Sequence, residues 1–511
     1  MSDATFLPAA IAEHAPVLVT VVPLILSSVA AALPNGRVAW GIALFGVFVS
    51  LLCAIELVFA TRADGAVLSY ALGGWEPPYG IEFRIDALNS AIVLLLSLIG
   101  LITLIFALPS IEDEIAKGKR SLFYAAFLIA FSGLAGVAVT GDAFNLFVFL
   151  EISSIATYAL IAMGWRNDRR ALTASFNYLV MGTIGATFFV IGVGFLYMVT
   201  GTLNMADMAV KISDLPGNRV VEAGYAFILV GIGLKTALFP LHLWLPNGYA
   251  FAPNFVTTFL AATATKVAFY VIIRFSFDTF AGEGAIVDDA MAYVIVPLAI
   301  AGMIIASAQA LFQADARRLL AYSSVAQVGY MLLGLGVATA AGISAGLLHL
   351  LNHAMMKAAL FMALGGFAYA YGVRRIDDLK GLGQAMPLTG AAFTIGALSL
   401  IGVPFTVGFI SKFYLIQAVL AEGWWWAVVA ILISSVLAVF YCYRMLIALW
   451  VNPIPTAGSL PVKEIRDVPM MILIPLWVLA FANVYFGVDA GPVIALARDA
   501  ADAVISGGAA R

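Results

Sequence analysis

Four lysines of this chain lie inside long apolar stretches, and a buried amine can take up and release a proton. They are Lys235, Lys266, Lys357 and Lys412. A lysine in the middle of a bilayer is costly unless it faces the protein interior or water, and such residues commonly mark ion paths. For Lys266 and Lys412 the alternative is a flexible side chain that carries its amine to the membrane surface. Four such lysines in one chain favour a path for hydrogen ions.

Glu151 is the carboxylate nearest the middle of an apolar stretch, in GDAFNLFVFLEISSIATYALIAMG. An unpaired carboxylate there would be protonated or would seek a cation, and Lys235 is the partner that we expect. Breaking such a pair would change how firmly the lysine holds its proton. A structural ion pair that keeps two helices in register is the alternative.

Three titratable residues follow one another at helical spacing in AGISAGLLHLLNHAMMKAALF. His349, His353 and Lys357 are four residues apart, so they form a stripe on one helix face, roughly 12 Å long. Histidine titrates near neutral pH, and such a stripe is typical of a proton relay. His349 could equally be a core histidine that binds a backbone carbonyl.

Proline interrupts two apolar stretches, each beside one of the lysines. Pro240 follows Lys235 in LKTALFPLHLWLPNGYAFAP, and Pro404 precedes Lys412 in LSLIGVPFTVGFISKFYLI. A proline removes a helical hydrogen bond, and membrane proteins keep broken helices only where the freed backbone is buried or lines a wet cavity. We expect His242, close to the first break, to cap a carbonyl that Pro240 frees, with membership of the proton path as the alternative.

The elements that must position these residues are membrane-spanning helices. The 511 residues are 63% hydrophobic and only 11% charged, against roughly 25% charged in soluble domains. Runs of about 20 apolar residues suit helices that cross a bilayer, and we expect an all-α polytopic membrane protein with about 14 such helices. The predicted segments are 16–33, 38–60, 84–108, 121–139, 143–163, 172–199, 222–247, 253–277, 289–312, 318–337, 341–371, 387–419, 424–450 and 467–488.

The two interrupted segments occupy matching places in two groups of five, which is the sequence sign of a transporter built from repeats. We therefore expect two inverted five-helix repeats, each with one broken helix. The predicted parts are an N-terminal part at 1–120 with three helices, repeats at 121–277 and 289–450, and a last helix with a tail at 451–511.

Lysine and arginine concentrate in the loops after odd-numbered helices, and cytoplasmic loops carry such an excess. Both termini are then expected on the opposite, periplasmic side. The net charge of −3 suggests no nucleic-acid partner, and two cysteines in apolar helices suggest neither a disulfide nor a metal site. The acidic N-terminus lacks the pattern of a cleavable signal peptide. The residues that set the bias are Arg37, Lys117, Lys119, Arg120, Arg166, Arg169, Arg170, Arg317, Arg318, Arg374, Arg375, Lys380, Arg444, Lys463 and Arg466.

Four ordered segments resemble the antiporter-like membrane subunits of respiratory complex I, membrane-bound hydrogenases and Mrp-type Na⁺/H⁺ antiporters. They are LKTALFPLHLWLPNGYAFAP, RRLLAYSSVAQVGYM, LLNHAMMKAALF and GVPFTVGFISKFYL. Lysine at 266, lysine rather than glutamate at 412, the GDAFNLFVFLEISS stretch and the chain length most resemble the D-type subunit of Mrp antiporters. The chain stops soon after its last predicted helix, so we expect no long lateral helix.

The resemblance implies a role for each matching position. Glu151 and Lys235 would form the key buried pair, while Lys266, His353 and Lys357 would continue a hydrated axis. Lys412 would lie near the far exit of that axis, and His242 matches the histidine of the PLHxWLP motif. Relatives in complex I often carry histidine at the position of Gln327, which cannot titrate.

The expected function is therefore proton translocation in a multisubunit antiporter of the bacterial inner membrane, surrounded by lipid. The chain itself would handle H⁺ without a cofactor or metal and would not be an enzyme, while Na⁺ would pass through partner membrane subunits. A subunit of a redox-driven proton pump is one alternative, and a single-chain solute carrier is another.

Overall fold

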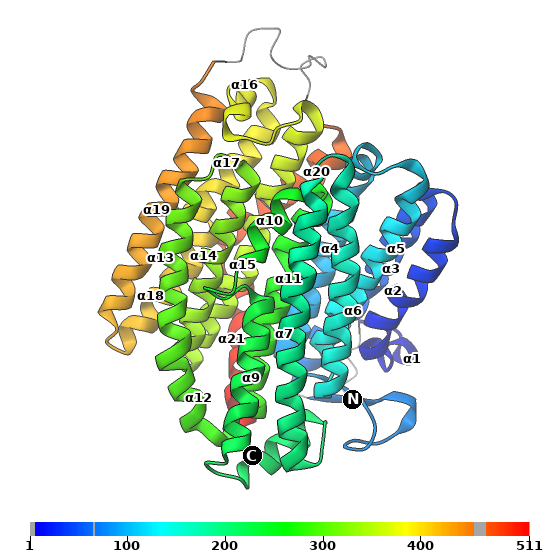
Figure 1. Ribbon diagram of the computed structural model, residues 1–511, viewed down its shortest axis with the longest axis vertical. Coiled ribbons are helices and arrows are strands. Elements are labelled where there is room, and N and C mark those ends of the chain that lie inside the picture. The colour runs from blue at the N-terminus through cyan, green and yellow to red at the C-terminus, as the bar shows by residue number, and fades with distance from the viewer. Residues whose placement is uncertain (1–5, 65–66, 454–466, 510–511) are drawn as a thin grey trace.

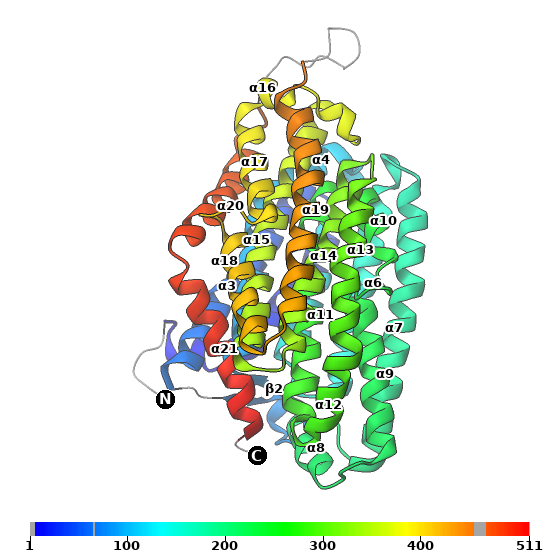
Figure 2. The same ribbon diagram turned by 90° about the vertical axis from the view of Figure 1, so that its left-hand side faces the viewer.

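The chain folds into one tall bundle of helices that run roughly along its long axis (Figures 1 and 2). The computed structural model describes residues 6–64, 67–453 and 467–509. Within these residues, twelve helices are long and apolar enough to cross a membrane, and two shorter apolar helices, Pro387–Ile401 and Val407–Ala421, accompany them. The predicted all-α polytopic fold is confirmed.

The helices follow the predicted segments closely, with short additional ones in the loops. In chain order they are α1 (Ala9–Ala12), α2 (Ala15–Ala32), α3 (Gly36–Asp64), α4 (Ala87–Glu114), α5 (Arg120–Val139), α6 (Ala143–Ala162), α7 (Arg170–Thr200), α8 (Met205–Ser213), α9 (Arg219–Thr236), α10 (Trp244–Phe251), α11 (Asn254–Arg274), α12 (Gly284–Ala290), α13 (Val296–Leu311), α14 (Ala316–Gly336), α15 (Ala340–Tyr371), α16 (Leu382–Ala385), α17 (Pro387–Ile401), α18 (Val407–Ala421), α19 (Trp425–Trp450), α20 (Met470–Val488) and α21 (Gly491–Ala509). The strands β1 (Leu68–Ala71) and β2 (Glu82–Ile85) pair antiparallel.

Two elements go beyond what the sequence patterns predict. The β1–β2 hairpin lies in a connection that carries no strong alternation of apolar residues. α21 occupies the stretch that the sequence analysis assigns to a tail. Its charged residues lower its overall hydrophobicity, but Ala497, Ala500, Ala501 and Val504 form a buried stripe, and the helix packs against α15 and α4. The helical period of that stripe is the signal that predicts α21.

Two groups of helices repeat the same order of packing in opposite directions. In the first group α5 packs on α6, α6 on α7, and α7 on the interrupted helix α9–α10. In the second group α13 packs on α14, α14 on α15, and α15 on the interrupted helix α17–α18. α5 begins at Arg120, whereas α13 ends just before Arg317. These two arginines lie at the same end of the bundle, so the groups are inverted.

Both predicted breaks are present. α9 ends at Thr236, and the next residue, Ala237, has a left-handed φ of 61°. α17 ends at Ile401, and Gly402 after it has a φ of 92°. Proline cannot donate a backbone hydrogen bond, so neither helix continues through its break.

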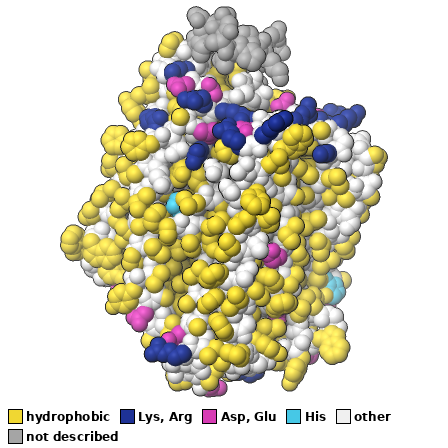
Figure 3. All heavy atoms as spheres, viewed as in Figure 1, with side chains coloured by type: hydrophobic (Ala, Val, Ile, Leu, Met, Phe, Trp, Pro, Cys, Tyr) yellow, Lys and Arg dark blue, Asp and Glu magenta, His cyan; other side chains and the backbone are white. Residues whose placement is uncertain are grey.

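Basic side chains gather at one end of the bundle, at the top of Figure 3. We call this the Arg-rich end. It surrounds the end of α4, where Arg37 pairs with Glu112, Lys119 and Arg166 line one hollow with Glu114, and Arg317 and Arg374 line another. α1 and the last turn of α21 lie toward the other end (Figure 1). Lys463 and Arg466, which contribute to the predicted charge bias, fall outside the described residues.

A buried ionic cluster fixes α4 to α11 at the end opposite the Arg-rich end. The Arg274 guanidinium lies 2.7 Å from a carboxylate oxygen of Asp86 and 3.1 Å from one of Asp278. Asp86 also accepts the backbone N–H groups of Leu88 and Asn89 and so caps α4. Burial alone would raise the pKa of Asp86, but the charge and hydrogen bond of Arg274 lower it overall.

Replacing Arg274 with Ala is expected to destabilise the fold by about 3–5 kcal/mol, because buried carboxylates would lose their cation. The free energy of unfolding of the purified protein in detergent micelles measures this. Arg219→Ala is the control, since that arginine pairs with Glu222 at the surface with 89% of its side chain exposed; surface pairs contribute about 1 kcal/mol or less. Equal small effects of the two substitutions would contradict the structural role of Arg274.

Candidate functional site: a buried row of lysines and histidines

The predicted pair of Glu151 and Lys235 is present beside the first helix break. The Lys235 Nζ lies 3.7 Å from Glu151 Oε1, and it donates a hydrogen bond to Ser154 Oγ at 2.5 Å. The two side chains, Lys235 and Glu151, are 6% and 23% exposed. At a separation of 3.7 Å the two charges form an ion pair but no hydrogen bond. The Lys235 amine therefore has two partners: it donates a hydrogen bond to Ser154, and it is attracted by the charge of Glu151.

Three residues on one face of α6 surround this amine, because Glu151, Ser154 and Tyr158 are spaced three and four apart. Gly182 on α7 leaves the room that they need: a Cβ there would lie 1.9 Å from the Tyr158 hydroxyl and 3.4 Å from the Lys235 Nζ. The Tyr158 hydroxyl is buried, and the Ser154 side chain is its neighbour on the same helix face. The sequence interpretation missed Ser154 and Tyr158, although their spacing from Glu151 pointed to them.

Lys266 is buried in α11, where only 1% of the residue is exposed. Its amine donates a hydrogen bond to the Ala261 carbonyl of the same helix and lies 3.5 Å from Thr265 Oγ1. The charge of Lys266 acts on His353 and Lys357 of the neighbouring helix α15. Lys266 therefore does not reach the membrane surface, and it groups with the α15 stripe rather than with the Lys235 pair.

The predicted stripe of His349, His353 and Lys357 is fully buried on α15. The two imidazole rings are parallel, with centroids 6.2 Å apart. Lys357 Nζ donates to the Leu320 carbonyl at 2.8 Å and to Ser323 Oγ at 2.5 Å. Because α15 runs along the height of the bundle (Figure 2), the stripe runs across the membrane, with Lys357 nearer the Arg-rich end.

His349 is held by side chains, not by a backbone carbonyl. Its Nε2 lies 3.0 Å from Gln327 Oε1 and its Nδ1 lies 2.9 Å from Ser411 Oγ. An amide oxygen can only accept, so Nε2 carries the hydrogen and the Nδ1 of the neutral ring accepts from the serine. Both ring nitrogens of His353, in contrast, lack a hydrogen-bond partner among the described residues.

Lys412 lies at the second break and is held by the end of the broken helix. Its Nζ donates to the carbonyls of Ile401 at 2.8 Å and Leu400 at 3.2 Å, and to Ser435 Oγ at 3.3 Å. The last carbonyls of a helix have no partner within the helix and carry partial negative charge, so a lysine suits them. The amine also lies 5.1 Å from the centre of the Tyr330 ring.

His242 lies at the first break, where the backbone of Pro240 and the side chain of Gln309 act on its imidazole. The residue is 2% exposed. The imidazole also packs against Phe239, with centroids 5.3 Å apart, and approaches Tyr322. The capping role therefore stays a prediction. The fold of the break turns the ring toward these aromatic side chains, which the sequence did not indicate.

The site thus has two parts. One is the Lys235 pair; the other joins Lys266, the α15 stripe and Lys412. Among the described residues, Lys235 bonds Ser154 and pairs with Glu151, whereas Lys266 bonds Ala261 and Thr265, so no hydrogen bond joins the two lysines. No group of three or more His, Cys, Asp or Glu side chains in the described residues is placed to hold a metal ion.

Sequence comparison relates the chain to membrane components of respiratory complexes and antiporters. A family described as "NADH:quinone oxidoreductase/Mrp antiporter, TM" matches residues 140–438. The chain is 40% identical over 484 residues to the N-type subunit of the NADH-quinone oxidoreductase of Desulforudis audaxviator, covering 93% of this chain and 95% of the relative. It is 33% identical over 432 residues to the D-type subunit of the Na⁺/H⁺ antiporter of Bacillus subtilis, covering 79% of this chain and 86% of the relative.

Solved structures share the whole architecture. A chain of the membrane-bound sulfane sulfur reductase, an archaeal respiratory membrane complex, superposes with a TM-score of 0.86 at 31% identity, covering 96% of this chain and 97% of that one. A chain of the Mrp complex from Dietzia sp. DQ12-45-1b superposes with a TM-score of 0.84 at 26% identity, covering 97% of this chain and 98% of that one. Both belong to membrane complexes, which supports other membrane proteins as partners of this chain.

Gly408→Ala is expected to destabilise the protein by about 1–3 kcal/mol, the usual effect of overpacking. A Cβ at Gly408 would lie 1.8 Å from the Ser399 carbonyl oxygen, so α18 would have to move away from α17 and carry Lys412 with it. Unfolding in detergent micelles measures the change. The matched control is Gly194→Ala in α7, where a Cβ meets nothing within 4 Å; it should be neutral or stabilising by up to about 1 kcal/mol. If both substitutions changed the free energy of unfolding in the same direction, the close approach of α18 to α17 would be contradicted.

Proposed function

The chain belongs to the family of membrane-spanning subunits shared by NADH:quinone oxidoreductases and Mrp antiporters, and on that basis we propose that it translocates protons in an Mrp-type antiporter. Such a complex exchanges H⁺ for Na⁺ or another monovalent cation. The likeness to the D-type antiporter subunit of Bacillus subtilis and to the Mrp complex of Dietzia supports this assignment.

One observation carries the proposal: three of the four buried lysines are held only by neutral oxygen atoms. Within residues 6–64, 67–453 and 467–509, Lys266, Lys357 and Lys412 donate to carbonyls and hydroxyls, and Lys235 alone has a carboxylate beside it. A charged side chain in a membrane interior pairs with an opposite charge or with backbone carbonyls, and it commonly marks an ion path. Lysines without a carboxylate beside them are suited to a cycle in which the amine is neutral for part of the time.

The proposed mechanism starts at the Glu151–Lys235 pair. Moving the carboxylate away leaves the ammonium of Lys235 unbalanced in a medium of low dielectric, which favours passing its proton on. Water carries the proton to the neutral amine of Lys266. From there it moves to the α15 stripe at His353 and Lys357, and leaves by way of His349 and Lys412.

The neighbouring hydroxyls support the last part of this route. The Ser411 hydroxyl bonds the Nδ1 of His349 at 2.9 Å and belongs to the residue directly before Lys412. Lys412 in turn donates to Ser435, whose hydroxyl lies 3.2 Å from that of Tyr330. His242 joins no hydrogen bond of the row among the described residues, and we assign it to the packing of the break.

We assign Na⁺ to partner subunits, because the described residues offer H⁺-carrying groups and no set of acidic ligands for a cation. The chain is then a transport subunit and not itself an enzyme. We place it in a bacterial plasma membrane, with the Arg-rich end on the cytoplasmic side and both termini on the periplasmic side, by the distribution of lysine and arginine.

A second function is favoured by the 40% identity to an NADH-quinone oxidoreductase subunit. In that case the same row would move protons in a redox-driven complex. The complex purified through a tag on this chain distinguishes the two. Flavin and iron–sulfur absorbance in it would favour the redox pump, and a complex composed of membrane subunits without these groups would favour the antiporter.

Lys235→Ala and Glu151→Gln are each expected to reduce Na⁺-driven proton movement about tenfold or more, equivalent to about 1.4 kcal/mol or more of barrier. Each removes one partner of the switching pair, while the helices around it keep their packing. The pH change of inverted vesicles on addition of Na⁺ measures the activity, and immunoblotting of the membranes measures assembly.

Lys211→Ala is the control for these variants, because this lysine pairs with Asp207 at the surface of α8. It should leave transport within about twofold of the wild type, a difference of only about 0.4 kcal/mol. An unchanged Na⁺ response in the Lys235 and Glu151 variants would refute the proposed function.

A further inference from the structure

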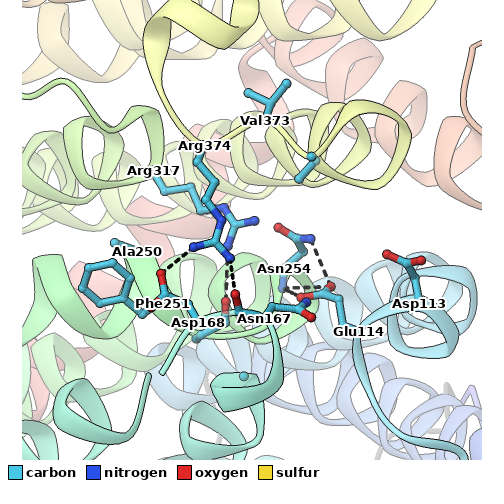
Figure 4. Close-up of a pocket in the computed structure, with 14 residues that line it drawn as sticks. Asp113, Glu114, Asn167, Asp168, Ala250, Phe251, Asn254, Arg317, Val373 and Arg374 are labelled. Carbon is cyan, nitrogen blue, oxygen red and sulfur yellow. Dashed lines mark hydrogen bonds and ion pairs between the residues drawn. The ribbon is translucent and has the colours of Figure 1, made fainter. Parts of the chain in front are cut away.

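A polar cavity of about 300 Å³ opens at the Arg-rich end, between the two inverted groups of helices (Figure 4). α4, α10, α11 and α15 contribute to its wall, together with the loop around Asp168. At about 30 Å³ for each molecule of liquid water, it has room for about ten waters.

Glu114, the last residue of α4, lines this cavity and is only 6% exposed. Its carboxylate accepts hydrogen bonds from Ser110 Oγ at 2.7 Å, from the Asn254 side-chain amide at 3.0 Å and from the Asn254 backbone N–H at 3.0 Å. All these donors are neutral. Glu114 therefore resembles Lys266, Lys357 and Lys412 in its neutral hydrogen-bond partners, while the charge of Arg317 also acts on it.

The other charged groups of the cavity differ from Glu114 in their surroundings. Arg317 faces Glu114 but donates to the Ala252 carbonyl at 3.3 Å (Figure 4). Asp168 binds Arg170 and Arg374, and these guanidiniums hold the pKa of Asp168 well below its usual range, so that it stays ionised. Asp113 is exposed at the rim.

A second hollow shares the wall formed by Glu114 on its other side. It is lined by Lys119 and Arg166 among apolar side chains. Both of these basic residues are exposed, and the hydrogen bonds of the Glu114 carboxylate come from Ser110 and Asn254 instead. Among the described residues that line these two hollows, Glu114 is thus the buried carboxylate.

Two helices lead from the cavity to the buried row. α11 begins at Asn254, beside Glu114, and reaches Lys266 after twelve residues, a rise of about 18 Å. α15 runs from Ala368 in the cavity wall to Lys357 over eleven residues, about 16 Å. Thr257 and Thr258 on α11 place hydroxyl groups along the first part of this distance.

We propose that Glu114 is the proton-collecting residue of the Arg-rich end. The carboxylate takes a proton from water in the cavity and becomes a neutral acid. It then gives the proton to water on the inner side, which carries it to a neutral amine at Lys357 or Lys266, and the carboxylate is restored. This inference rests on the proposed function, because it requires that these lysines accept protons.

A purely structural role would be the capping of α11 through Asn254. Glutamine keeps an oxygen that accepts from Asn254 but cannot carry a proton, so Glu114→Gln separates the two roles. In vesicles that contain the whole complex, we expect this variant to slow Na⁺-driven proton movement about tenfold at normal membrane abundance, a barrier increase of about 1.4 kcal/mol. Asp113→Asn, at the rim of the same cavity, should leave the rate unchanged.

A second measurement covers the case in which a loss of rate reflects altered packing. Glu114→Ala leaves space beside a wet cavity, and millimolar formate added from the Arg-rich side should restore transport several-fold, because formate supplies a carboxylate. Formate should not restore Lys235→Ala, whose defect lies elsewhere in the row.

Wild-type transport in Glu114→Gln, or a slow Glu114→Ala that formate does not restore, would overturn the inference. Full activity of Lys235→Ala would instead overturn the proposed function. The two failures are therefore distinguishable in one set of vesicles.

Discussion

The whole structure depends on keeping amines inside a membrane without giving each of them a counter-charge. Lys235, Lys266, Lys357 and Lys412 are all at most 8% exposed, and a bare ammonium in hydrocarbon is prohibitively unfavourable. The bundle meets this constraint with oxygen atoms that carry partial charge only: helix-terminal carbonyls, serine and threonine hydroxyls. Such partners stabilise the protonated amine to a limited degree and also tolerate the neutral amine, which a carboxylate at each position would not.

The broken helices follow from this constraint. An intact helix uses its carbonyls internally, whereas a helix that stops in mid-membrane leaves several of them free. At the second break Ile401 and Leu400 present these carbonyls to Lys412. At the first break the partners differ. Lys235 lies before the interruption, and its amine bonds Ser154 and pairs with Glu151, both on α6. The inverted groups therefore share one architecture but hold their lysines with different chemistry.

In the proposed mechanism, this difference gives the two halves different parts in one process. A charge pair can open and close, and so the first half has the property of a switch. The second half has serially placed amines and imidazoles, with Gln327 and Ser411 fixing the orientation of His349, and so it has the property of a route. Between the halves, the cavity at the Arg-rich end brings a buried carboxylate, Glu114, to the start of the same helix that carries Lys266.

The sequence by itself determined the membrane class, the broken helices and the set of lysines and histidines, because hydrophobicity, proline and helical spacing act locally. It also indicated the Glu151–Lys235 pair, since one mid-span carboxylate had few possible partners. Only the tertiary structure decided what each amine touches. Ser154, Ser323 and Ser435 are ordinary small polar residues in the sequence, and they matter because the packing of separate helices brings them within reach of Lys235, Lys357 and Lys412. The same packing turned His242 to aromatic neighbours and buried Glu114, since the surroundings of a side chain are set by which helices meet and not by its own stretch of sequence.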